Sequence, residues 1–428
     1  MINKKRQFIL SLNLFLSIAL LLFVYVYCLV TLYFYWWHIV FIFYGIIVIP
    51  YVVFSLVHAH QYSPVPDKGY RPKVSVIIPC YNEGDSVTRT ISAVLCSDYP
   101  KDKLDLMVVD DGSTDNTPSI VTDMLAKYSN VFRFLKMPKN MGKRHALAYG
   151  IEHAHGEIVV CIDSDTIIEP NALVNLVQPF ADSKVYCACG NAIVSKECLP
   201  KERFNILARL QKVWYTDGYY IRKGSENLFG VVLCCSGVLS AFRKDKVQQI
   251  LPNWLNEKFM GKKCVSGEDA QLTNWMLKLG GKSVFQSTAV VYTGVPVSLK
   301  AFVKQQLRWG RGSFYSMVTA SKIFLKRNLF EKLTFYSTFL ISLLSPFMLF
   351  FGVISITLFG GILAILLFLL GFLLIGFVAA FTCKMLANYF TISDVFYRIG
   401  LFILMMFLTV TYFYSWVTIW REKTWGTR

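Results

Sequence analysis

Two blocks of this chain carry almost no charge. Phe8 to Val30 and Trp36 to Val57 contain no Asp, Glu, Lys or Arg, and residues 333–420 contain only three such residues. Because roughly 20 apolar residues cross a hydrocarbon core, each block is long enough to hold membrane-spanning helices. The first run is longer than the apolar part of a signal peptide and lacks a small-residue cleavage site. The pattern predicts a multi-pass membrane protein whose partner is the lipid bilayer.

The predicted spans enclose a central domain with the charge and turn content of a soluble fold. We expect two spans within residues 1–60 and three near 333–358, 361–382 and 400–420. Lys and Arg gather in the N-terminal head and in the central domain, so the positive-inside rule places both on the cytoplasmic side of the cell membrane. Five spans would leave the basic C-terminus outside, so we also expect a sixth span or a re-entrant half-span within 383–399.

Composition narrows the class further. Hydrophobic residues make up 54% of the 428 residues and charged residues 17%, which excludes a disordered chain. The formal net charge of +17 fits nucleic acid, an anionic membrane face or an anionic substrate as partner. Most of the 11 cysteines lie in the predicted cytoplasmic domain, where thiols stay reduced, and their spacing matches no zinc site. We therefore expect free, mostly buried thiols.

Residues 70–298 alternate between strand and helix patterns. Short β-branched runs predict strands at Lys73–Pro79, Leu104–Val109, Val131–Leu135 and Glu157–Ile162, separated by predicted helices at 85–97, 115–128 and 142–154. Apolar strands that alternate with helices form a mostly parallel sheet covered on both faces, which is an α/β fold. Ligands of such sheets bind beyond the carboxyl ends of the strands. Polar clusters lie at those ends, at 80–83, 110–113 and 163–165.

Asp163 and Asp165 are the most specific of these polar residues. Two positions apart beyond a strand, they project to one side, where two carboxylates repel each other unless a cation neutralises them. Hard oxygen ligands open to solvent suit Mg²⁺ or Mn²⁺ shared with phosphate groups. Asp110, Asp111 and Ser113 also fit the ordinary use of such residues as turn and helix-cap groups.

Taken in order, the segments VSVIIPCYNE, VVDDGSTDNT, NMGKRHAL and CIDSD resemble the family 2 glycosyltransferases, whose fold is the GT-A nucleotide-sugar domain. The resemblance implies a binding site for the UDP of the donor that includes Tyr81, Glu83, Asp111, Lys143 and Arg144. It also implies that Asp165, with Asp163, orders Mn²⁺ or Mg²⁺ on the diphosphate. A cation and fixed positive side chains stabilise the charge that departing UDP gathers.

The segment Gly267-Glu268-Asp269 opens a predicted helix. Acids are favoured at a helix N-terminus by the helix dipole, so a purely structural role is one interpretation. The other is a general base that takes the proton of an acceptor hydroxyl. In the family the final Asp of this motif is the base, which implies that Asp269 has that role and that Glu268 positions it.

Gln305-Gln306-Leu307-Arg308-Trp309 matches the QxxRW signature of processive members of the family. Arg308 suits a bidentate grip on a diphosphate, and Trp309, with Gln305, offers a surface for the acceptor sugar. Basic and aromatic residues throughout 299–330 also predict amphipathic helices at the membrane interface, and the two interpretations are compatible. A second aromatic segment, Phe204 to Tyr220, has the same character.

Two further segments resemble hyaluronan synthases and nodulation chitooligosaccharide synthases, and this resemblance covers roughly residues 70–428. The C-terminal WGTR implies that Arg428 approaches the donor diphosphate. The segment Cys235, Ser236 and Gly237 borders the acceptor pocket in those families. However, Gly-Glu-Asp at 267–269 replaces the Gly-Asp-Asp usual in hyaluronan synthases and is closer to the chitin-forming branch.

The resemblance implies a membrane-embedded, processive, inverting glycosyltransferase that polymerises UDP-GlcNAc and UDP-GlcA into hyaluronan and exports the nascent polysaccharide. A chitin-like, GlcNAc-only synthase is the main alternative. A non-processive lipid-linked enzyme and an inactive membrane scaffold are less favoured, because the QxxRW motif and all the expected carboxylates are present. The positive charge then serves the membrane face and the donor site, and no nucleic-acid partner is expected. The expected order is 1–60 spans, 70–298 catalytic domain, 299–330 interfacial helices, 331–420 spans and 421–428 cytoplasmic tail.

Overall fold

The structure of the protein is a computed structural model that describes residues 39–128, 131–199, 205–359 and 361–419. The chain forms two compact units. One takes in residues up to Tyr62 together with Arg209–Phe229 and Phe324–Tyr414, and the other takes in Ser63–Ala208, Gly230–Ile323 and the chain from Ser415 onward. The first unit is helical, and the second is built on a β-sheet.

The sheet has the strand order β3-β2-β1-β4-β7-β6-β10-β5. Its strands are β1 (Val74–Cys80), β2 (Leu104–Asp110), β3 (Arg133–Lys136), β4 (Ile158–Ile162), β5 (Ile167–Ile168), β6 (Val185–Val194), β7 (Leu239–Arg243) and β10 (Lys282–Thr293). The first four strands pair in parallel, as predicted, and so do β6 and β10. β7 runs antiparallel between β4 and β6, and β5 runs antiparallel to β10. The sheet is therefore mostly parallel with a reversed strand at its centre.

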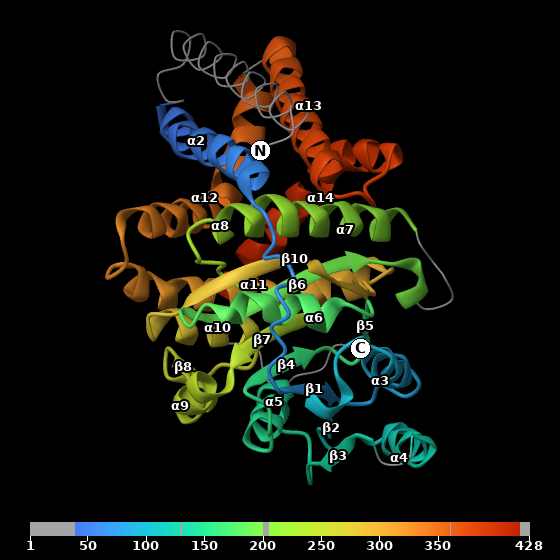
Figure 1. Ribbon diagram of the computed structural model, residues 1–428. Coiled ribbons are helices and arrows are strands. Elements are labelled where there is room, and N and C mark those ends of the chain that lie inside the picture. Colours follow the sequence, from blue (N-terminus) through green and yellow to red (C-terminus); the bar gives the residue numbers. More distant parts are fainter. Residues whose placement is uncertain (1–38, 129–130, 200–204, 360, 420–428) are drawn as a thin grey trace. The chain divides into compact units, whose positions relative to one another are not determined.

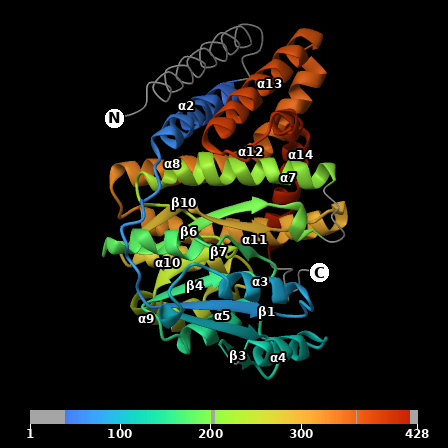
Figure 2. The same ribbon diagram turned by 45° about the vertical axis from the view of Figure 1, so that its right-hand side comes forward.

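Helices cover the sheet, as Figures 1 and 2 show. They are α3 (Ser86–Leu95), α4 (Thr117–Lys127), α5 (Lys143–Glu152), α6 (Ala172–Val177), α9 (Lys244–Leu255) and α10 (Glu268–Lys278). A further helix, α11 (Leu299–Phe324), contacts α10. α5 packs on β1 and β2, and the layer continues from α5 through α9 to α10. α6 packs on β6 and β10. Every residue of β1 and β4 is buried, which is why their sequences are continuously apolar. A separate hairpin, β8 (Lys258–Phe259) with β9 (Lys262–Lys263), lies between α9 and α10 in the chain.

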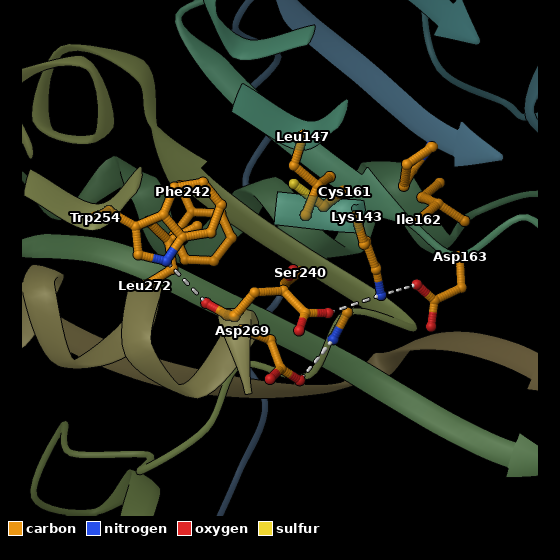
Figure 3. Close-up of a pocket in the computed structure, with 13 residues that line it drawn as sticks. Lys143, Leu147, Cys161, Ile162, Asp163, Ser240, Phe242, Trp254, Asp269 and Leu272 are labelled. Atoms are coloured by element: carbon orange, nitrogen blue, oxygen red, sulfur yellow. Dashed lines mark hydrogen bonds and ion pairs between the residues drawn. The ribbon is translucent and has the colours of Figure 1, made fainter. Parts of the chain in front are cut away.

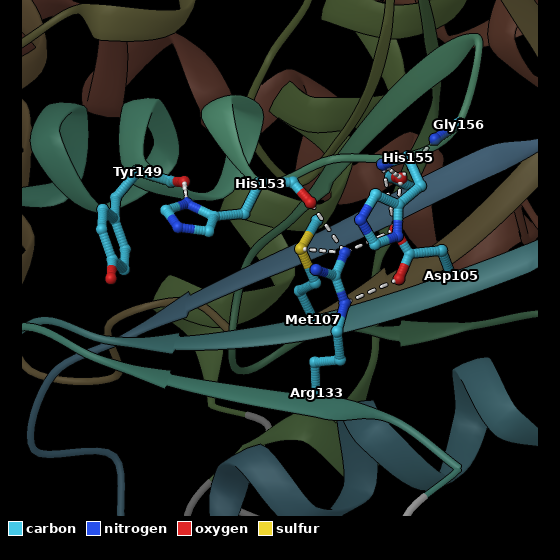
Figure 4. A network of polar contacts seen from close by, with 8 residues as sticks. Asp105, Met107, Arg133, Tyr149, His153, His155 and Gly156 are labelled. Carbon is cyan, nitrogen blue, oxygen red and sulfur yellow. Dashed lines mark hydrogen bonds and ion pairs between the residues drawn. The ribbon is translucent and has the colours of Figure 1, made fainter.

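An ionic network joins three strands at the end of the sheet where β1 and β2 begin (Figure 4). The guanidinium of Arg133 on β3 contacts both carboxylate oxygens of Asp105 on β2, at 3.0 and 2.7 Å. Ser75 on β1 donates a hydrogen bond of 2.6 Å to the same carboxylate. The Ser75 hydroxyl in turn accepts hydrogen bonds from the backbone N–H groups of His155 and Gly156. The half-buried carboxylate of Asp105, through Ser75 and Arg133, thus links β1, β2, β3 and the turn before β4.

The helical unit contains α2 (Ile39–Gln61), most of α7 (Ile206–Thr216), a π-helical turn η6 (Asp217–Lys223), α8 (Gly224–Asn227), α12 (Leu329–Phe359), α13 (Gly361–Leu386) and most of α14 (Ile392–Val417). Two ion pairs tie α7 and η6 to α14. Lys212 lies 2.7 Å from Asp394, and Arg398 lies 2.6 Å from Asp217.

The extra span expected within 383–399 is wrong. α13 continues to Leu386, a short turn follows, and α14 begins at Ile392. The turn is held by Asp394, whose carboxylate accepts a hydrogen bond of 2.7 Å from the backbone N–H of Thr391. The polar residues of this stretch therefore cap a helix and form ion pairs within the helical unit.

Helices form at all the predicted C-terminal positions, but within the part of the chain that the structure describes, no helix is both long enough and apolar enough to cross a membrane. The all-helical membrane region thus has no support from the described helices. The predicted span at Phe8–Val30 lies outside the described residues.

Candidate active site

The polar clusters predicted at the strand ends meet at one edge of the sheet. The loops after β1 and β2 are joined by hydrogen bonds. The backbone N–H of Asn82 donates to the hydroxyl of Ser113 at 3.0 Å, and the side chain of Asn82 accepts from the backbone N–H of Thr114 at 2.8 Å. In the same loop the N–H of Glu83 donates to Thr117 at 2.9 Å, while the Glu83 carboxylate accepts from Ser86. Tyr81 and Glu83 are both half-buried in this joined pair of loops.

Asp111 connects these loops to the start of α5. The Asp111 side chain is fully buried, and its two oxygens accept hydrogen bonds of 2.8 Å from the backbone N–H groups of Met141 and Gly142. Burial raises the pKa of Asp111, while those two hydrogen bonds oppose the rise. The carboxylate therefore shapes the loop that delivers Lys143, a role additional to the nucleotide contact implied by the resemblance.

Lys143 is the centre of the charged cluster. Its ammonium lies 2.5 Å from Asp163 at the end of β4 and 3.3 Å from Glu268 at the start of α10. Its side chain is only 15% exposed, so the two ion pairs are poorly screened by water. A single cation thus connects the predicted metal carboxylate with the predicted base motif.

These groups line one pocket, shown in Figure 3, with a volume of ≈ 300 Å³ that includes open solvent. Lys143, Asp163, Gly237, Glu268 and Asp269 form its polar part. The backbone N–H of Gly237 donates a hydrogen bond of 3.2 Å to Asp269. The pocket therefore brings together residues that lie more than a hundred positions apart in the chain.

The apolar part of the pocket includes Phe242, Leu272 and Trp254. The indole of Trp254 is fully buried and donates a hydrogen bond of 3.2 Å to the backbone carbonyl of Glu268. Nothing in its sequence context marks Trp254 as a site residue, because a Trp near the end of an amphipathic helix is usually core. Only the folded arrangement of α9 against α10 shows that it supports the base motif.

The two carboxylates of the motif have opposite electrostatic environments. Burial and the neighbouring charge of Glu268 raise the pKa of Asp269 above its ordinary value. Burial also disfavours ionised Glu268, but Lys143, a backbone hydrogen bond and the Arg308 guanidinium outweigh it and lower the pKa of Glu268. Glu268 is therefore the member of the pair that ionises more readily, and Asp269 is the one suited to take up a proton.

Arg144, predicted to lie close to the nucleotide, does not line the pocket. It is 5% exposed and bonds the Trp254 carbonyl, the Gln271 side chain and Glu257. Its position places it in the packing between α5, α9 and α10.

The segment predicted to border the acceptor pocket is mostly buried. Cys235 is fully buried, and its backbone N–H donates a hydrogen bond of 2.9 Å to Thr273. Ser236, next to it, is half-buried.

The residues of the QxxRW motif lie on α11. Gln305, Arg308 and Trp309 are all half-buried, and the backbone carbonyl of Arg308 accepts a hydrogen bond of 3.3 Å from Ser266, next to the base motif. The described chain also ends beside α11, since Arg311 donates to Thr418 at 3.1 Å. Arg428 lies outside the described residues.

Asp163 and Asp165 are both half-buried at the turn after β4. Among the described residues, no group of three or more His, Cys, Asp or Glu side chains is arranged to hold a metal ion. Two hard carboxylates open to solvent fit a cation that takes its other ligands from a diphosphate and water, rather than a closed protein cage. The donor set therefore fits Mg²⁺ or Mn²⁺ shared with substrate.

Comparison with known families agrees with this geometry. The profile of the family described as glycosyltransferase like family 2 matches residues 72–312. The chain belongs to glycosyltransferase family 2. The matched residues contain the pocket, both halves of the charged cluster and the QxxRW motif.

Two relatives and one solved structure illustrate the similarity. The hyaluronan synthase of Streptococcus pyogenes is 35% identical over 287 residues, covering 65% of this chain and 66% of the synthase. An N-acetylglucosaminyltransferase of Mesorhizobium japonicum is 34% identical over 262 residues, which cover 60% of each protein. The alignments thus span less than two thirds of these relatives.

A mannosyltransferase from Pyrobaculum calidifontis, solved with GDP-Man and Mn²⁺, has a TM-score of 0.60 at 20% identity, and the superposition covers 87% of this chain and 96% of that one. With the family match, this similarity confirms the predicted GT-A fold.

Proposed function

We propose that the protein transfers sugars from UDP donors to the hydroxyl of a growing polysaccharide, with inversion and processively, and that it is a hyaluronan synthase. The observation that carries the proposal is the pocket in which Asp269, Glu268, Lys143 and Asp163 converge. A base, a fixed cation and a carboxylate suited to a phosphate-bound metal are the groups that sugar transfer from a nucleotide donor needs. The family and its relatives support the reaction class.

In this proposal Asp269 takes the proton of the acceptor hydroxyl as that oxygen attacks the anomeric carbon. The bond between the anomeric carbon and the diphosphate breaks, and UDP leaves with the bonding electrons. The Gly237 N–H, at 3.2 Å, holds the Asp269 carboxylate in place, and the raised pKa of Asp269 makes it a stronger base than an exposed aspartate. Lys143, and Arg308 on α11, supply positive charge near the leaving group.

Asp163 and Asp165 would hold a divalent cation, which neutralises the charge that develops on the diphosphate. The mannosyltransferase of the same fold contains Mn²⁺, which supports a divalent cation here, either Mn²⁺ or Mg²⁺. We expect removal of divalent cations to weaken UDP-sugar binding measured by calorimetry, and Asp165→Asn to do the same. Asp123→Asn, an exposed change on α4, is the control. Equal donor affinity with and without chelator would exclude the metal.

Asp269→Asn tests the base directly. The change keeps the size of the side chain and removes the proton acceptor, so we expect polymerisation to fall by about 100-fold or more. Binding of UDP, which does not need the base, should stay within a few-fold of the wild type. Equal loss of binding and turnover would contradict the assignment of Asp269 as the base.

The identity of the polymer is tested by supplying UDP-sugars singly and in pairs to the purified protein. Long product that needs UDP-GlcNAc and UDP-GlcA together supports hyaluronan. Product from UDP-GlcNAc alone supports the second candidate, a chitin-like synthase. That candidate is favoured by Gly267-Glu268-Asp269 in place of Gly-Asp-Asp and by the rhizobial N-acetylglucosaminyltransferase relative.

The proposal places the enzyme in the cell membrane with its catalytic domain in the cytoplasm. The uncharged run Phe8–Val30 behind a basic head supports it. Large apolar side chains on α12 and α13 are also exposed, including Phe351 at 56% and Ile362 at 80%. Exposed large apolar side chains gathered on two helices are typical of surfaces that contact lipid or protein.

A further inference from the structure

The start of α10 and the middle of α11 touch through two glycines. A Cβ atom added at Gly312 would lie 2.9 Å from both Cα and N of Gly267, and a Cβ added at Gly267 would lie 2.9 Å from Cα of Gly312. Both distances are shorter than real Cβ contacts, and the opposing atoms are backbone, which cannot rotate away. Gly267 also has φ = +76°, a left-handed conformation that glycine adopts without strain. The two backbones can therefore meet only because neither residue has a side chain.

Hydrogen bonds on either side fix the register of this contact. Ser266 donates to the backbone carbonyl of Arg308 at 3.3 Å, and the 6%-exposed Asn274 donates to that of Ser316 at 2.9 Å. Arg308, Gly312 and Ser316 are spaced four residues apart, so they form one ridge of α11. Three successive turns of α11 thus contact Ser266, Gly267 and Asn274, from the residues just before α10 to its middle.

This contact bears directly on the pocket. Gly267 immediately precedes Glu268 and Asp269, and Arg308 on the same ridge is close enough to lower the pKa of Glu268. We propose that Gly312 is a positioning residue: its backbone contact with Gly267 sets the place of the Asp269 base relative to the QxxRW helix. The inference rests on the proposed function and assigns a role to a residue outside the motifs.

Gly312→Ala tests the inference. The new methyl group has no space against Gly267, so the base motif must shift. A displacement of about 1 Å at a reacting group can cost on the order of 100-fold in rate, so we expect kcat to fall by roughly 10- to 100-fold. The donor KM should change by less than about threefold, because the loops after β1 and β2, which hold the nucleotide in the proposed function, lie outside this contact. Alanine is otherwise favoured over glycine within a helix, so helix propensity predicts no loss.

Ser313→Ala is the matched control, since it makes an alanine at the next, exposed position of the same helix. We expect wild-type kcat from it. If Gly312→Ala retains the kcat of Ser313→Ala, or loses donor affinity as much as kcat, the inference is overturned. If Gly312→Ala does not fold, Ser266→Ala removes a contact of the same interface without adding volume. A several-fold lower kcat would then support the inference, and a wild-type kcat would overturn it.

A second measurement does not depend on activity. The thiol of Cys234 lies 3.6 Å from the Asp269 carboxylate, which disfavours the thiolate. Moving Asp269 away should raise the alkylation rate of Cys234 several-fold in Gly312→Ala but not in Ser313→Ala, with the exposed Cys96 as internal reference in mass spectrometry. Unchanged Cys234 reactivity would overturn the inference. Absence of transfer from any UDP-sugar by the wild type would instead contradict the proposed function, while the Cys234 comparison still decides the role of Gly312.

Discussion

Asp269 and Glu268 are adjacent carboxylates whose pKa values are shifted in opposite directions by their surroundings. Lys143, 3.3 Å from Glu268, stabilises the charge of that residue, and the charge of Glu268 then opposes ionisation of Asp269. A base must be deprotonated to act. The pKa of Asp269 is raised, so Asp269 becomes protonated at a higher pH than an exposed aspartate would. As pH falls, the enzyme should therefore lose transfer activity at that higher pH.

Glu268→Gln removes the like charge and leaves Lys143 in place. The pKa of Asp269 should fall, so the acidic limb of the pH profile of kcat should move to lower pH, whatever happens to the maximal rate. The measurement is kcat from pH 4 to pH 9 for the wild type and the variant. Asp123→Asn, far from the pocket on α4, should leave the limb where it is. A limb that stays in place or moves to higher pH in Glu268→Gln would contradict the coupling of the two carboxylates.

For single residues, the sequence predicts which side chains take part in the chemistry better than it predicts which residues support them. Asp163 and Asp269 belong to recognisable motifs. In the structure Lys143 forms ion pairs with Asp163 and with Glu268, the residue next to Asp269. Trp254 and Gly312 have no such signal, because their roles depend on which helix packs beside the motif. Arg144 shares a motif with Lys143 but is turned into the packing between helices, which follows from the helical period: adjacent positions face different directions.

The secondary-structure elements of the catalytic unit follow two different rules. β1 to β4 are all predicted within a few residues. β1 and β4 are buried along their whole length, so their sequences are continuous apolar, β-branched runs that are easy to recognise. β3 is only partly buried and is recognised from its position between two predicted helices. β7 and β10 leave no such signature. β10 mixes buried positions with partly exposed ones. β7 is antiparallel between two strands distant in the chain, so its partners are set by the whole sheet. The reversed strand at the centre is thus a property of topology, not of local sequence.

Asp105 gives a prediction about these elements. Its carboxylate holds Arg133 on β3 and Ser75 on β1, so Asp105→Asn leaves a guanidinium without its charged partner. We expect a loss of about 1–3 kcal/mol in stability, typical of a hydrogen bond to a charged group, measured by thermal unfolding of the purified protein in detergent at pH 7. UDP binding should be unaffected by the change itself, because the network lies at the opposite ends of the strands from the pocket.

The same network has a defined pH dependence. Burial raises the pKa of Asp105, but hydrogen bonds from Ser75, Arg133 and the His155 N–H outweigh it and leave the pKa below its usual value. A carboxyl whose pKa is lowered on folding stabilises the fold above its unfolded pKa of about 4, and this stability is lost as pH falls through the folded value. The stability difference between wild type and Asp105→Asn should therefore shrink below about pH 4. A difference that is constant or grows on acidification would contradict the assigned role.

The whole molecule combines a net charge of +17 with long apolar runs, and either feature can hold a protein at a membrane. Charge attraction to anionic lipid is screened over about 10 Å at 0.1 M salt, so high salt or alkaline carbonate releases a protein held in that way. Burial of apolar segments is insensitive to both treatments and yields only to detergent. We expect the full chain to sediment with cell membranes, to stay there in 1 M salt and in carbonate, and to be extracted by mild detergent. Release by salt would instead assign the attachment to the basic surface and contradict the predicted spans.

Deletion of residues 1–38 separates the contributions of the N-terminal run and of the helices. If the N-terminal run acts alone, the truncated protein becomes soluble. If the truncated protein still resists extraction by carbonate, a share of the attachment belongs to the exposed apolar side chains of α12 and α13.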